Sequence, residues 1–155
     1  GFGEFAVPDM LSVRHSLGWT LYLMNLSKAD IETLAERLAY PALLTKAVIS
    51  ASTLKKVLPS FKEWKPSQWT FHLDDLPSLS VYAVYLVSKE NGLSEYLAKW
   101  QHVKPITTGD DLKARGLEPG PRFGEILRQL RAARLDGEVR NEEDESRLLA
   151  SLANN

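Results

Sequence analysis

The chain of 155 residues has the length of one domain or two small ones, and its hydrophobic and charged fractions, 44% and 25%, are ordinary for a soluble globular protein. The absence of cysteine excludes a disulfide framework and a cysteine zinc site, and it fits a reducing cytoplasm. The longest apolar run, Leu79 to Val87, is too short to span a bilayer, and the first ten residues do not resemble a signal peptide. We therefore expect a cytoplasmic protein with no membrane partner. Because the chain begins with Gly1, we interpret it as a piece of a longer protein.

The net charge of −1 argues against a surface that is basic all over, but the charge is unevenly distributed. Residues 99–134 carry eight Lys and Arg against four Asp and Glu, whereas residues 135–155 carry two against six. Local fields, more than the total charge, steer a polyanion towards a protein. A basic segment followed by an acidic end therefore leaves room for a local nucleic-acid contact.

Helical periodicity dominates the first two-thirds of the chain, and no segment alternates apolar and polar residues as a strand does. Prolines and capping residues divide this region into expected helices that cover about residues 8–26, 28–40, 41–58, 67–74, 78–90 and 94–104. The segment after Pro77 is apolar on nearly every side and is expected to be central and buried. Asn91-Gly92 is expected to end that helix, and Ser94 is expected to cap the next one.

The region after residue 105 is rich in Gly and Pro. Thr108 is expected to cap a helix of about two turns, with Asp111 at the position that completes a capping box. Gly116 can end this helix in the left-handed conformation. Pro119-Gly120-Pro121 predicts a stiff corner, and Pro121 suits the first position of the next helix.

The helix that begins at Pro121 is expected to run to about Leu135 and to stop at Gly137. Gly124 in its first turn costs about 1 kcal/mol relative to alanine, so we expect another backbone to approach closely there. Apolar side chains form one face of this helix, and arginines point away from that face. Asn141 is predicted to cap a last helix whose first turn is acidic, which suits the positive end of the helix dipole.

These residues carry a family resemblance. The stretch "ITTGDDLKARGLEPGPRFGEILRQLRAARLDGEV" resembles the C-terminal segment of bacterial tRNA nucleotidyltransferases (CCA-adding enzymes) and of their poly(A) polymerase relatives. The positions that match the family pattern, with its spacing intact, are Gly109, Asp111, Leu112, Gly116, Leu117, Pro119, Gly120, Pro121, Gly124, Leu127, Leu135, Asp136 and Gly137. The resemblance is firm over about 35 residues and loose before them.

In that family an N-terminal head, with a Gly-Ser turn and an Asp-x-Asp pair, binds metal and transfers nucleotides. Nothing in this chain matches that head. The resemblance therefore implies a non-catalytic fragment that holds tRNA while the head of the parent chain adds nucleotides to RNA 3′ ends. It implies no cofactor in the fragment itself, whereas the parent would use Mg²⁺ and ATP or CTP. Whether the fragment has an activity of its own is left open.

The expected fold is all-α, with seven to eight short helices. A helical body covers residues 1–104, and a C-terminal helix–turn–helix tail over 105–155 packs on the body. The expected partners are RNA, in particular tRNA, and the catalytic head of the parent chain. No catalytic residue or metal ligand is predicted. The candidate RNA-binding residues are Lys113, Arg115, Arg122, Arg128 and Arg131, which would contact phosphates and the A-form shape with little base recognition.

Other interpretations stay open. The same cations can form a solvated face that the acidic end balances. The Pro/Gly turn before a helix also suits a DNA-binding helix-hairpin-helix, although that motif usually has Gly-x-Gly where this chain has Gly-Pro. A structural or dimerisation module is a third possibility. Trp64 and Trp69 are expected to be core anchors more than base-stacking residues, and Asp74-Asp75 to be caps or solvated charges more than Mg²⁺ ligands.

Overall fold

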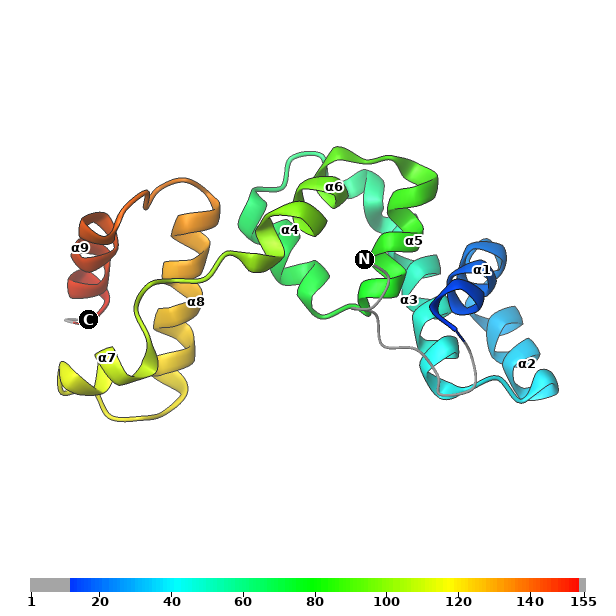
Figure 1. The fold of residues 1–155 in the computed structure, drawn as a ribbon, viewed down its shortest axis with the longest axis horizontal. Coiled ribbons are helices and arrows are strands. Elements are labelled where there is room, and N and C mark those ends of the chain that lie inside the picture. Colours follow the sequence, from blue (N-terminus) through cyan, green and yellow to red (C-terminus); the bar gives the residue numbers. More distant parts are fainter. Residues whose placement is uncertain (1–11, 154–155) are drawn as a thin grey trace.

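Every regular element between residues 12 and 153, the part of the chain that the structure describes, is a helix. In this computed structural model (Figure 1) the helices are α1 (Val13–Leu23), α2 (Lys28–Leu38), α3 (Ala42–Val57), η2 (Leu58–Phe61), α4 (Pro66–Asp74), α5 (Ser78–Ser88), α6 (Asn91–Ala98), η3 (Trp100–His102), α7 (Gly109–Ala114), α8 (Pro121–Leu135) and α9 (Glu142–Ala153). The all-α fold class expected from the sequence is confirmed. The expected start of the first helix at Pro8 lies outside the described residues.

The core of the body is built around α5. This helix packs against α1, α3 and α6, and its Val81, Ala83 and Val84 are fully buried, as its apolar sequence predicted. The same buried cluster reaches α4 through Trp69 and Leu73. A second, smaller cluster joins α1, α2 and α3 at the end of the molecule farthest from α8 (Figure 1). Among residues 12–153, no helix has both the length and the apolar character needed to cross a bilayer.

The boundary between α5 and α6 differs from the prediction. Lys89, with φ of 54°, closes α5, and its N–H donates to the Tyr85 carbonyl at 2.8 Å. Asn91 and Gly92 begin α6 instead of ending α5, so Ser94 lies inside that helix and is not its cap. Gly92 is needed for a different reason: a Cβ there would come within 2.6 Å of the Trp69 ring. Close approach of α6 to α4, and not helix termination, explains this glycine.

The carboxyl-terminal helices α7, α8 and α9 form a separate group, which we call the tail, next to the body helices α1–α6 (Figure 1). Four buried side chains form the hydrophobic cluster at the centre of the tail: Leu112, Ile126, Leu130 and Leu149. α8 also packs against α4 of the body. A connector, residues 101–108, joins the two groups. The division at residues 104 and 105 stays a prediction.

Local signals in the tail were predicted well. The Thr108 hydroxyl accepts from the Asp111 N–H at 3.3 Å, and the Asp111 carboxylate completes the capping box by accepting from the Thr108 N–H at 2.7 Å. α8 runs from Pro121 to Leu135, and Gly116 and Gly137 have φ of +82° and +76°. The expectation for Gly124 is wrong, because a Cβ there would meet nothing within 4 Å and the residue faces solvent. Nothing in the structure explains this glycine.

Candidate nucleic-acid interface

The contact between tail and body is made by α8 lying antiparallel to α4. At one end of α4, the Asp136 carboxylate accepts from the Ser67 N–H at 2.9 Å and from the Ser67 hydroxyl at 2.7 Å. At the other end, the Arg131 guanidinium pairs with Asp74 at 2.6 Å. The two helices are therefore fixed to each other at both ends of α4.

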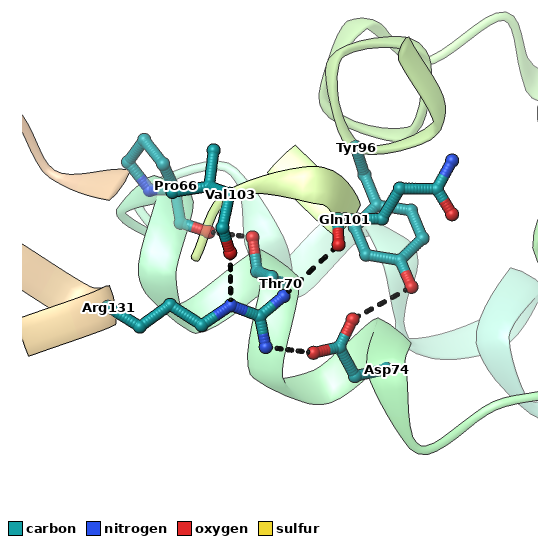
Figure 2. Close-up of polar contacts among 7 residues, drawn as sticks. All are labelled: Pro66, Thr70, Asp74, Tyr96, Gln101, Val103 and Arg131. Atoms are coloured by element: carbon teal, nitrogen blue, oxygen red, sulfur yellow. Dashed lines mark hydrogen bonds and ion pairs between the residues drawn. The ribbon is translucent and has the colours of Figure 1, made fainter. Parts of the chain in front are cut away.

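Arg131 also holds the connector. Its Nε donates to the Val103 carbonyl at 2.8 Å and another guanidinium nitrogen to the Gln101 carbonyl at 3.4 Å, as Figure 2 shows together with the Asp74 pair. Asp74 in turn accepts from the Tyr96 hydroxyl at 3.0 Å. Burial and the neighbouring Asp74 carboxylate raise the pKa of Tyr96, so that hydroxyl stays protonated and donating. Asp74 thus belongs to a hydrogen-bonded network that the sequence did not predict, although it lies at an exposed position, and Asp75 is exposed at the carboxyl end of α4, as expected of a cap or solvated charge.

A buried carboxylate fixes the connector from the opposite side. Glu145, at 1% exposure, accepts from the backbone N–H groups of Ile106 at 3.2 Å and Thr107 at 2.7 Å, and it pairs with Arg134. Burial acts to raise the pKa of Glu145, but the hydrogen bonds from Thr107, Arg134 and Ile106 together lower it below its ordinary value. The ionised carboxylate is therefore the form that suits the folded tail.

A groove of about 530 Å³ opens where α4, the connector and α8 meet. Phe71, Pro105 and Leu127 supply its apolar lining, and Lys104 and Arg128 supply cations. The volume lies in the range of small-molecule and nucleotide pockets. Because Arg131 neutralises Asp74, the remaining charges along the groove are those of Lys104, Arg128 and Asp75.

Arg128 is an exposed cation of this groove, as is Lys104. The Arg128 guanidinium carbon lies 4.3 Å from the centroid of the Phe71 ring. Between residues 12 and 153 no ion pair or hydrogen bond involves the Arg128 side chain, and the same holds for Lys104. A guanidinium over an aromatic ring keeps its in-plane N–H groups available for an anion. Arg128 is thus oriented by Phe71 without being neutralised.

The five predicted RNA-binding residues have different surroundings, and the structure brings only Arg128 and Arg131 together at the groove. Arg122 donates to the carbonyls of Leu152 and Ala153, at 3.3 and 3.1 Å, and so closes the end of α9. Lys113 pairs with Asp110 at 3.3 Å on the surface of α7.

Arg115 follows α7 and lines a separate cavity of about 300 Å³, together with the acids Asp111, Glu142 and Glu145. This cavity is therefore rich in negative charge and differs in character from the groove at α4. Arg115 thus lies beside three acids, although it forms an ion pair with none of them.

Two groove residues were missed from the sequence. Lys104 was counted only in the charge of its segment, and its position before Pro105 in the connector could have marked it as exposed. Phe71 carried no signal, because its partner Arg128 is far away in the sequence. Trp64 and Trp69 are core anchors, as expected: Trp69 is buried, and the Trp64 ring stacks on the Phe61 ring with 3.9 Å between the ring centroids. Among the described residues, no three His, Cys, Asp or Glu side chains gather as a metal site would require.

Comparison with known proteins gives one curated similarity. No family model matches the chain, and no solved structure matches it. A stretch of 61 residues is 41% identical to an A-adding tRNA nucleotidyltransferase of Geobacter sulfurreducens, covering 39% of this chain and 7% of that protein. The chain therefore spans only a small part of this relative's length. The similarity supports a relationship to tRNA nucleotidyltransferases at a coarse level.

Proposed function

We propose that this chain is a non-catalytic, tRNA-binding part of an enzyme that adds nucleotides to RNA 3′ ends. The similarity to the A-adding tRNA nucleotidyltransferase carries the proposal, because it supplies both the class of enzyme and the class of ligand. Catalysis, with Mg²⁺ and ATP or CTP, belongs in this proposal to a separate head of the parent chain. The helices described here bind the RNA that the head extends.

The groove at α4 and α8 is the proposed contact site. Arg128 and Lys104 are cations without an acidic partner among the described residues, and both line the groove. A guanidinium held in a fixed plane matches the geometry of a phosphate, and a lysine adds a mobile charge beside it. Binding through a few phosphates, with little base recognition, is how proteins hold double-stranded RNA.

The other predicted cations contribute in different ways. Lys113, in an exposed pair with Asp110, and Arg115, beside the acids of its cavity, are secondary candidates that can extend the contact along the RNA. Arg122 and Arg131 already donate to groups within the chain, so we assign them to the folded structure and not to phosphate contacts. This division narrows the five candidates to one central residue, Arg128, supported by Lys104.

A salt titration with fluorescently labelled tRNA tests the proposal. The affinity should fall steeply between 50 and 200 mM salt, because phosphate contacts release counterions. Arg128→Gln should weaken binding by about tenfold and reduce the slope of log affinity against log salt by about one. Arg37→Gln is the matched control, since Arg37 is an exposed arginine at the end of α2, far from the groove (Figure 1). It should leave the affinity unchanged.

Three results would contradict the proposal. Absence of salt-sensitive tRNA binding at high protein concentration would overturn it. Tighter binding to duplex DNA than to tRNA would favour the helix-hairpin-helix interpretation. Self-association by light scattering, with no RNA binding, would favour a dimerisation module. Normal binding by Arg128→Gln, together with weakened binding by Arg115→Gln, would instead place the site at the cavity that Arg115 lines with residues of α7 and α9.

A further inference from the structure

We propose that Asp136 and Arg131 form a two-point clasp on α4 that sets the position of the tail and thereby the alignment of Arg128 with Phe71. Both would be positioning residues and not RNA contacts. The effect on RNA rests on the proposed function, whereas the clasp itself can be tested without RNA. The proposal assigns a role to Leu135-Asp136-Gly137, which local sequence signals explain only as the end of a helix.

The first point of the clasp is at the amino end of α4. Pro66 has no N–H, so Ser67 supplies the first free backbone donor of this helix, and Asp136 accepts it at 2.9 Å. The second carboxylate oxygen accepts the Ser67 hydroxyl at 2.7 Å. A carboxylate at a helix amino end is also favoured by the helix dipole. Asp136 therefore caps α4 from another part of the chain.

The turn after α8 keeps Asp136 in place. Asp136 is the last residue before Gly137, whose φ of +76° reverses the chain. The N–H groups of Glu138 and Val139 both donate to the Ala133 carbonyl, at 2.8 and 3.0 Å. These bonds hold the turn closed, so the carboxylate is presented to Ser67 by a rigid segment.

The second point is at the carboxyl end of α4, where Arg131 pairs with Asp74. The Arg131 side chain is 21% exposed, and its remaining donors go to the connector carbonyls of Val103 and Gln101. Asp74 has its other oxygen on the Tyr96 hydroxyl. Arg131 therefore joins α8 to α4, through Asp74, and to two carbonyls of the connector (Figure 2).

The spacing of the two points suits an antiparallel helix pair. Arg131 and Asp136 are separated by about 7.5 Å of helix rise, and Ser67 and Asp74 by about 10.5 Å, at 1.5 Å per residue. The long Arg131 side chain makes up the difference. Phe71 lies between the two clasped residues of α4, and its ring carries Arg128 at 4.3 Å and Arg131 at 5.8 Å. Fixing both ends of α4 to α8 thus fixes the position of Phe71 relative to Arg128, two of the side chains that line the groove.

The first test uses the protein without RNA. The chain has no cysteine, so Thr53→Cys in α3 and Ala150→Cys in α9, both at exposed positions, can carry spin labels on body and tail. Asp136→Ala should broaden the distance distribution between the labels and speed hydrogen exchange at the Ser67 amide by about tenfold or more. Glu138→Ala is the matched control, because Glu138 is an exposed acid in the same turn whose pair with Lys65 is long, at 3.7 Å. It should change neither quantity.

An unchanged distance distribution in Asp136→Ala overturns the clasp. If that variant does not fold, Asp136→Asn and Ser67→Ala, singly and together, replace it. Their effects on the Ser67 region should be coupled, because they remove the two sides of one contact, and additive effects would count against the clasp.

The second test adds tRNA and separates positioning from contact. Arg131→Met should broaden the label distances and weaken RNA binding together, whereas Arg128→Gln should weaken binding with unchanged distances. If Arg131→Met weakens binding without changing the distances, Arg131 is a phosphate contact and the clasp is wrong at that point. If no variant and no wild-type protein binds tRNA, the proposed function fails, while the label distances still decide the clasp.

Discussion

The body and the tail are both helical, but different interactions hold their helices together. The body surrounds α5 with a large apolar cluster that takes side chains from α1, α3, α4 and α6. The tail has a smaller cluster of four buried apolar residues at its centre, and two carboxylates add to it: Glu145, buried within the tail, and Asp136, half-buried against the body. Truncating an apolar side chain in a large cluster removes only the contacts of that side chain. Removing one partner of a buried ion pair also leaves the other charge buried without compensation, which destabilises the fold strongly.

This difference predicts that body and tail can be destabilised separately. All four tryptophans lie in the body, at positions 19, 64, 69 and 100, so tryptophan fluorescence reports on the body alone. Helical circular dichroism reports on both. Urea unfolding followed by both signals therefore distinguishes the two regions, and each prediction below uses or extends this comparison.

The largest effect is expected for Glu145→Ala. The change leaves Arg134 without its carboxylate and leaves the N–H groups of Ile106 and Thr107 without an acceptor. Removing one partner of a buried pair costs about 3–5 kcal/mol. We expect part of the circular dichroism transition to move to lower urea while the fluorescence transition changes little.

The matched control for Glu145→Ala is Leu93→Ala in the body. Leu93 is fully buried in the cluster around α5, so its truncation should cost about 2–5 kcal/mol. This loss should shift the fluorescence transition. If the two variants shifted both signals equally, body and tail would unfold as one unit and the comparison would fail.

A smaller effect is expected from acidification. The pKa of Glu145 lies below its ordinary value of 4.5 in the folded tail, so its carboxylate contributes stability that is present above pH 4.5 and is lost as the pH falls through the folded pKa. Asp111 acts in the same direction below its ordinary 3.8, because the Thr108 hydroxyl and then the Thr108 N–H lower its pKa. Between pH 5 and pH 3, the urea midpoint followed by circular dichroism should therefore fall before the midpoint followed by tryptophan fluorescence does.

Glu145→Gln is the control for this pH dependence. Glutamine cannot ionise, so the variant should begin with a less stable tail at pH 7 and lose less on acidification than the wild type. An equal loss of tail stability in both proteins would show that other carboxylates cause the pH dependence.

The sequence predicted elements that depend on neighbours a few residues away. The capping box at Thr108, the limits of α8 and the left-handed glycines at 116 and 137 all follow from local hydrogen bonding and backbone freedom. The prediction that Asn91-Gly92 ends a helix was wrong, because Gly92 is required by the close approach of the Trp69 ring. A local sequence pattern carries no information about a residue that far away in the chain.

The candidate site was predicted less well for the same reason. The helical spacing of α8 placed Arg128 and Arg131 away from the apolar stripe, but it gave no partner for either. Their partners Phe71 and Asp74 are 57 residues distant in the sequence. A net charge count treats the two arginines as equal. In the structure, Asp74 neutralises Arg131, whereas Arg128 lies over the Phe71 ring without an ion pair.

The smallest expected effect compares two matching helix caps, Ser27 in the body and Thr108 in the tail. Each hydroxyl accepts from the N–H of an aspartate three residues on, at 3.2 Å for Asp30 and 3.3 Å for Asp111, and each donates to that carboxylate. Ser27→Ala and Thr108→Ala should each cost about 1 kcal/mol. The two caps share these hydroxyl bonds, and Thr108 adds a bond from its own N–H to Asp111 at 2.7 Å, which both wild type and Thr108→Ala can make.

The helices that these caps begin should respond differently to the same loss. α2 has eleven residues and buries two of them in the body, whereas α7 has six and buries only Leu112. A helix as short as α7 is unstable without its cap and its contacts. Hydrogen exchange followed by mass spectrometry should therefore show fraying of α7 in Thr108→Ala and little change in α2 in Ser27→Ala. Equal protection of both helices would mean that the tail is held as firmly as the body, because its carboxylate bonds then compensate for its small apolar centre.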